Sequence, residues 1–175
     1  MSTERLDYRD SELLQFSATV VAVEGSGDRT LIETDRTAFY PTSGGQPHDT
    51  GYLGDAKVIE VADQDGRVVH IVEGESESAG QSILGRIDGA RRRDHMQQHS
   101  GQHILSQAFE HAAGLRTVSF HLGTTSCTID LDRARVSEDE IRRAERLAQS
   151  VVLDDRPILT HFTESDDLEL SSRPR

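Results

Sequence analysis

The chain of 175 residues is poor in several residue types, and each shortage excludes a class of protein. A single cysteine, Cys127, excludes a disulfide framework and a zinc site built from cysteines alone. No run approaches the roughly 20 apolar residues that a membrane-spanning helix needs, and residues 1–20 lack the apolar core of a signal peptide. Aromatic residues make up only 5% of the chain, and tryptophan is absent. The composition predicts a soluble cytoplasmic protein of one domain or two small ones.

Positive charge is also scarce, and it is unevenly distributed. The formal net charge is −12, and Lys57 is the only lysine among the 19 basic residues. This excludes a broadly basic nucleic-acid coat, because neutralising phosphates needs surplus lysine and arginine. Residues 1–90 carry 17 acidic and 7 basic residues, whereas residues 91–175 carry 14 and 12. A polyanionic partner is therefore expected on the second half, at Arg91, Arg92 and Arg93, although a solvated helix start would carry the same charges.

The first half of the chain has the pattern of short strands. β-branched segments separated by turn residues predict six of them, at residues 16–23, 30–34, 37–40, 56–61, 68–72 and 82–87. A loop rich in proline and glycine, residues 41–51, follows the third. Six short strands with close turn signals indicate a small barrel or an open sandwich.

From about residue 91 the apolar period becomes helical. A first helix is expected to end near Gly114, and two strands follow at residues 117–122 and 125–131. Ser137 and Glu140 have the spacing of a capping box, which opens a second helix that stops at residues 154–157. A last strand is expected at residues 158–162. The pattern predicts an α+β protein, with a domain of short strands at residues 1–90 and a domain of helices packed on a sheet at residues 91–175.

Two histidines four residues apart form the first chemical motif. His99 and His103 would lie on one face of the first helix, where two imidazoles can bind one divalent metal such as Zn²⁺. Surface or core histidines would show the same spacing. His95 extends the stripe but lies about 12 Å from His103 along the axis, too far to share the ion. His121, on the following strand, could turn toward the pair. A zinc protease is disfavoured, because Ser100 replaces the glutamate that would act as general base.

The second motif is the polar stretch within residues 41–51. Paired glycines, Gly44 and Gly45, let a backbone approach a ligand closely and present N–H groups to an oxyanion, although a simple turn would look the same. Thr42, Ser43 and Gln46 flank them with hydrogen-bonding side chains. Cys127 stands mid-strand among apolar residues and is expected to be a buried structural thiol.

Taken together and in this order, the motifs resemble the alanyl-tRNA editing proteins of the AlaX family. The matching stretches are residues 39–51, 92–106 and 119–132. The resemblance implies a translation-protein-like β-barrel followed by the editing domain shared with threonyl-tRNA synthetases. It also implies hydrolysis of mischarged tRNA(Ala), chiefly Ser-tRNA(Ala) and sometimes Gly-tRNA(Ala). Such a second sieve is needed because a pocket for alanine rejects similar-sized side chains poorly.

The resemblance also implies roles for the motif residues. In the family, zinc is held by the helix pair, here His99 and His103, and by a later Cys-x-x-x-His. The loop carrying Thr42, Ser43, Gly44, Gly45 and Gln46 would face the site and recognise the serine hydroxyl, with Gln46 and His121 as site-lining candidates. The tRNA acceptor end would dock at the arginine triplet.

The chain departs from the family pattern at the second pair of zinc ligands. Cys127 is followed four residues later by Leu131 rather than histidine, and no Cys-x-x-x-His occurs. With the polar tail after residue 162, this favours a piece of a longer editing protein, in which zinc binding by this chain alone is weak or absent. A non-catalytic module that binds the tRNA acceptor is the main alternative. A peptide-release tripeptide at Gly44, Gly45 and Gln46 is a weaker one, because the surrounding basic scaffold is missing.

Overall fold

A computed structural model describes residues 2–26, 29–74, 78–123 and 126–159. In chain order the elements are β1 (Glu4–Arg5), the 3₁₀ helix η1 (Leu6–Tyr8), β2 (Gln15–Ser26), β3 (Arg29–Thr34), β4 (Arg36–Thr37), β5 (Gly51–Leu53), β6 (Ala56–Gln64), β7 (Arg67–Glu73), β8 (Ser82–Ile87), α1 (Gly89–Ala113), β9 (Thr117–Leu122), β10 (Cys127–Leu131) and α2 (Glu138–Leu153). The chain is of mixed α+β class, as the sequence predicts.

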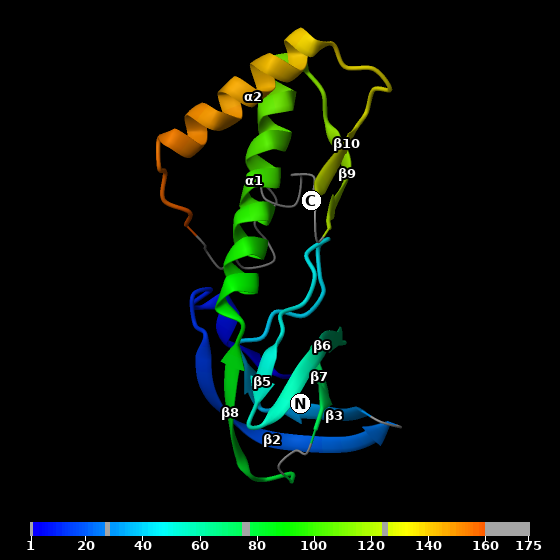
Figure 1. The fold of residues 1–175 in the computed structure, drawn as a ribbon, viewed down its shortest axis with the longest axis vertical. Coiled ribbons are helices and arrows are strands. Elements are labelled where there is room, and N and C mark those ends of the chain that lie inside the picture. Colours follow the sequence, from blue (N-terminus) through cyan, green and yellow to red (C-terminus); the bar gives the residue numbers. More distant parts are fainter. Residues whose placement is uncertain (1, 27–28, 75–77, 124–125, 160–175) are drawn as a thin grey trace, which may run out of the picture.

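Six antiparallel strands close on themselves at one end of the molecule (Figure 1). Their order is β2-β3-β7-β6-β5-β8, and β8 pairs back onto β2. Alternate side chains point inward because successive residues of a strand face opposite sides. The core inside the ring is led by Phe16, Ile32, Leu53 and Val58 from the strands, all almost fully buried.

The strand predicted at residues 37–40 is wrong. Only Arg36–Thr37 is a strand, β4, and it pairs in parallel with β1 outside the ring of six. The sixth strand of the ring is instead β5, which begins at the last residue of the predicted loop. Phe39 leaves the strand path to fill the core, where its ring meets Phe16 and His70 edge-on. The Tyr40 N–H then donates to a side chain, Asp49 Oδ2, at 2.7 Å.

Helix α1 extends directly from the barrel. Asp88 separates it from β8 and caps it by accepting the N–H groups of Ala90 and Arg91. The helix ends at Gly114, in the left-handed conformation with φ of 65°, where the sequence places its end. Figure 1 shows α1 rising from the barrel, with α2 against its upper part and the β9–β10 hairpin beside it. A second apolar cluster, centred on Ala108, Phe109 and Leu115, joins these elements.

Two further expectations for the second half fail or go untested. Cys127 is exposed rather than buried, because it lies in a described sheet of only two strands, β9 and β10. The Sγ–H of Cys127 donates to Gln98 Oε1 at 3.3 Å. Ile158 and Leu159 are exposed and outside any strand, while residues 160–162 of the predicted last strand lie outside the described residues. Neither α1 nor α2 has the length and apolar content to cross a bilayer.

Candidate functional site

A buried ion pair fixes the start of α1 to the loop of residues 41–51. The Arg92 guanidinium is 3% exposed and donates to the fully buried carboxylate of Asp49 at 2.5 Å. Its Nη1 and Nη2 atoms also donate to the backbone carbonyls of Ser11 and Ala38. Arg92 is therefore directed into the protein rather than toward solvent, and its contact with tRNA stays a prediction.

The two neighbouring arginines remain closer to solvent. Arg91 is half-buried, and its Nε–H donates to the His48 carbonyl at 3.0 Å. Arg93 is exposed. The flanks of the triplet are therefore more exposed than its centre.

The paired glycines form a tight two-residue turn. Ser43 and Gln46 exchange two backbone hydrogen bonds of 3.1 and 2.9 Å across it. Gly44 and Gly45 have φ of 54° and 78°, the left-handed values that a type I′ turn requires of both central residues. A side chain at Gly45 would place its Cβ 2.7 Å from Cε2 of Phe120, so the turn packs directly on β9.

Gln46 joins this turn to the histidine pair, His99 and His103. Its side chain is 5% exposed, and its Oε1 accepts the Nδ1–H of His99 at 2.8 Å. This burial disfavours peptide release as the role of residues 44–46. The two Nε2 atoms of the histidine pair lie 3.1 Å apart, and their rings stack with centroids 4.9 Å apart. The structure thus brings residues from both sequence motifs into one site.

The histidine pair has the geometry of two ligands to one metal ion. Burial, and then His103, lower the pKa of His99, so its ring is neutral at neutral pH. With Nδ1–H held by Gln46, the lone pair of His99 lies on Nε2, facing His103. Two Zn–N bonds at a tetrahedral angle place their nitrogens about 3.3 Å apart, close to what is seen. The residues fit half of a zinc site: the described part of the chain holds no cluster of three His, Cys, Asp or Glu that would complete one.

Phe120 is a member of this site that the sequence reasoning missed. Its ring centroid lies 5.9 Å from that of His99 and 6.4 Å from that of His103. Consecutive side chains on β9 point to opposite faces, so His121, the site-lining candidate, is exposed and is not brought to the pair. The alternation of side chains along the predicted strand indicates that Phe120 and His121 face opposite sides. It does not indicate which of the two sides packs on α1.

The loop threonine and serine differ in what they can do. Thr42 Oγ1 bonds His48 Nδ1 at 3.0 Å and accepts the His48 N–H at 3.2 Å, so this hydroxyl shapes the loop. The Nε2–H of His48 donates in turn to the Ile59 carbonyl at 3.0 Å. Ser43 is exposed, and its hydroxyl bonds no described residue, which leaves it open to a ligand.

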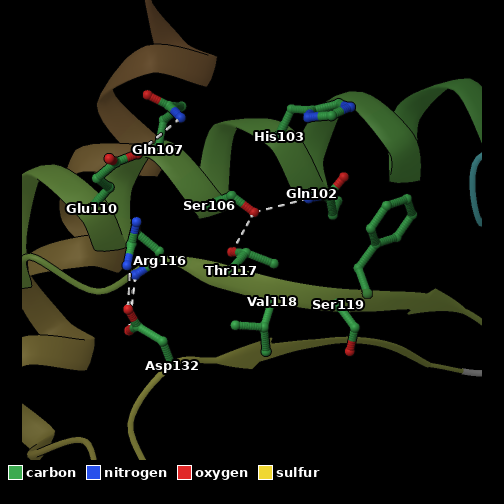
Figure 2. A pocket seen from close by; sticks show the side chains of 11 residues that line it. Gln102, His103, Ser106, Gln107, Glu110, Arg116, Thr117, Val118, Ser119 and Asp132 are labelled. Carbon is green, nitrogen blue, oxygen red and sulfur yellow. Dashed lines mark hydrogen bonds and ion pairs between the residues drawn. The ribbon is translucent and has the colours of Figure 1, made fainter. Parts of the chain in front are cut away.

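A pocket of about 300 Å³ adjoins the histidine pair between α1 and β9 (Figure 2). His103 lines one end of it. Inside, Gln102 Nε2 and Thr117 Oγ1 both donate to Ser106 Oγ at 2.8 Å. Gln102 Oε1 is buried and accepts no hydrogen bond from any residue the structure describes. The sequence reasoning did not single out Gln102 or Ser106, although their spacing places them on one helical face.

Comparison with known proteins identifies the chain's relatives. Residues 7–91 match the family described as class II (A) tRNA synthetases. The chain is 36% identical to an alanine–tRNA ligase of Archaeoglobus fulgidus, over 96% of this chain and 19% of the ligase. It is 31% identical to the alanyl-tRNA editing protein Aarsd1 of Rattus norvegicus, over 94% of this chain and 43% of that protein. The chain thus spans less than half the length of these relatives, and together these matches support an AlaX-like alanyl-tRNA editing protein.

Proposed function

We propose that the chain is a trans-editing hydrolase that cleaves the ester of mischarged tRNA(Ala), chiefly Ser-tRNA(Ala) and also Gly-tRNA(Ala), at a zinc-containing site. The observation that carries the proposal is the hydrogen bond from His99 Nδ1 to Gln46 Oε1, which joins the loop motif and the helix motif into one site. A relative named an alanyl-tRNA editing protein, aligned over 94% of the chain, supports it. In this proposal residues 1–90 form a translation-protein-like barrel domain and residues 91–175 the editing domain.

In this proposal some residues of the site bind the metal and others bind the acyl group. His99 and His103 hold the zinc, with Gln46 fixing the ring of His99. When bound, zinc acts as a Lewis acid on the ester or orients the attacking water. Ser43 and the backbone of Gly44 and Gly45 are placed to bind the hydroxyl of a seryl group.

The environment of the pair also contributes to ester hydrolysis. Phe120 packs beside both imidazoles and the Gly45 turn closes against its ring, which keeps bulk water from that side of the pair. Polar interactions at the site are stronger where water is excluded. The acceptor end of the tRNA would approach from the start of α1, where Arg93 is exposed.

Deacylation of matched substrates tests the proposal. Ser-tRNA(Ala) and Ala-tRNA(Ala) are incubated with the protein and with its His99→Ala and His103→Ala variants, and the zinc content of each is measured by elemental analysis. We expect faster loss of the seryl ester with the wild-type protein, and loss of both zinc and activity in the variants. Equal, protein-independent decay of the two esters would refute the proposal.

A non-catalytic module that binds the tRNA acceptor is the second candidate. It is favoured by the two-ligand geometry, since the described residues supply only two imidazoles to a metal that prefers four ligands. In this chain alone we accordingly expect weak zinc binding. Retained binding of tRNA(Ala), with no zinc and no hydrolysis of either ester, would select this function over the first.

A further inference from the structure

The pocket between α1 and β9 begins at the proposed reaction site. His103 lines the pocket and is also one of the histidine pair, while Gln102 precedes it on the helix. Gln46 reaches the pair through His99, one helical turn earlier. When the ester of an aminoacyl group lies at the histidine pair, the Gly-rich turn is on the side of His99. The pocket is then on the side of His103.

One residue that lines the pocket, Gln102, carries a buried hydrogen-bond acceptor without a donor in the described part of the chain. Gln102 is 8% exposed, yet its Oε1 has no donor among the described residues. Figure 2 shows the amide nitrogen of Gln102 directed to Ser106 and the oxygen turned away from it. A buried acceptor left without a donor costs free energy, so the site favours a ligand that supplies one.

The charges around the pocket favour a positive donor. Two carboxylates, Glu110 and Asp132, line it together with one guanidinium, that of Arg116. Arg116 Nε lies 3.5 Å from Asp132 Oδ2, so these two charges compensate each other. Among the described residues, the Glu110 carboxylate accepts a hydrogen bond only from the side-chain amide of Gln107, at 3.3 Å. The lining therefore keeps a negative excess, and a cation is the better ligand.

We propose that this pocket binds the free α-ammonium group of the aminoacyl ester, with Gln102 Oε1 as its hydrogen-bond acceptor. The inference rests on the proposed function and deepens it. The ammonium is borne by the carbon next to the ester carbonyl, so a carbonyl at the histidine pair brings it to the end of the pocket that His103 lines. Acylation of that nitrogen removes the charge, and N-acylated aminoacyl-tRNA is thereby excluded.

Binding of an uncleavable analogue tests the pocket without relying on hydrolysis. The probes are 3′-seryl-amido-3′-deoxyadenosine and its N-acetyl derivative, titrated by calorimetry into the wild-type chain. Gln102→Leu removes the acceptor, and Gln102→Glu keeps one. Gln149→Leu, on an exposed position of α2, is the matched control. Thermal unfolding checks that each variant is folded.

We expect the wild-type chain, Gln102→Glu and Gln149→Leu to bind the free amine at least about tenfold more tightly than the N-acetyl form. Gln102→Leu should bind the two probes with similar Kd. Equal binding of both probes by the wild-type chain would overturn the inference, as would a preference that survives in folded Gln102→Leu. Because neither probe contains an ester, failure of the editing function itself would appear only in the deacylation assay.

Discussion

At the scale of single residues, Gln46 is the side chain through which the barrel orients the histidine pair. Its Oε1 accepts from His99 Nδ1 at 2.8 Å and so determines which ring nitrogen stays free for a metal. We expect Gln46→Ala to weaken zinc binding and deacylation by about 10- to 100-fold, the usual effect of losing a group that orients a metal ligand. Metal titration and Ser-tRNA(Ala) hydrolysis measure the effect. Gln149→Ala should change neither, and a collapse of the melting temperature in Gln46→Ala would make the turn structural instead.

His70 is a second residue with a measurable consequence, because its protonation opposes folding. Complete burial lowers its pKa to about 4, although its hydrogen bond to the Ile32 carbonyl acts in the opposite direction. Between pH 6.5 and 4 the unfolded chain binds a proton there and the folded chain does not. The free energy of unfolding should therefore fall as the pH falls through this window, by about 3 kcal/mol in total.

Urea unfolding at several pH values between 7 and 4 measures this slope. His70→Gln removes the titrating group and should flatten the profile by about 1.4 kcal/mol per pH unit. Burial also lowers the pKa values of His95 and His99, so some slope of the same sign will remain. An unchanged profile in folded His70→Gln would contradict the assignment.

The sequence identified those site residues whose placement is local. His99 and His103 share a helical face because of their spacing, and the glycine pair demands a turn. The placement of the other site residues depends on packing between segments that are distant in the sequence. Arg92 is buried because Asp49, 43 residues earlier, meets it, and no local pattern shows that. Phe120 rather than His121 joins the site because of the face that β9 turns to α1.

At the scale of elements, the Asp49–Arg92 ion pair connects α1 to the loop that carries the Gly-rich turn. Both side chains are almost fully buried. We expect Arg92→Ala to lower the free energy of unfolding by about 3–5 kcal/mol, because it leaves the Asp49 carboxylate buried without its partner. Arg93→Ala, one residue along and exposed, should change it by no more than about 0.5 kcal/mol. Denaturant unfolding compares the two, and similar losses in both would show that the pair does not anchor the helix.

The ends of the helices were predicted correctly where the sequence contains capping residues. A strand was predicted wrongly where a segment instead places a side chain in the core. Ser137 caps the start of α2, and its hydroxyl and backbone both bond Glu140 as the capping-box pattern predicts. α1 stops before Gly114, where glycine takes the left-handed conformation that commonly ends a helix. The β-like residues 38–40 form no strand, since Phe39 is needed inside the barrel and Tyr40 donates to Asp49. Such tertiary demands override local β propensity.

At the scale of the whole molecule, the negative charge is concentrated in the first half of the chain. Residues 1–90 hold 17 acidic and 7 basic residues, a balance of −10 out of the total −12. Figure 1 shows most strands of this half closing into the barrel, with α1 leading away from it. A tRNA acceptor end would meet the least repulsion on the second half, where Arg93 is exposed near the start of α1.

This charge arrangement predicts a local, salt-dependent tRNA contact rather than a general one. Arg93 and Arg146 are both exposed arginines that form no ion pair with described residues, but Arg93 lies on α1 and Arg146 on α2. Arg93→Glu and Arg146→Glu change the net charge equally. Only Arg93→Glu should weaken binding of tRNA(Ala) and lower the slope of log Kobs against log salt by about 1. Binding titrations at several salt concentrations measure both quantities, and equal effects of the two variants would mean that net charge, not a contact at the start of α1, governs binding.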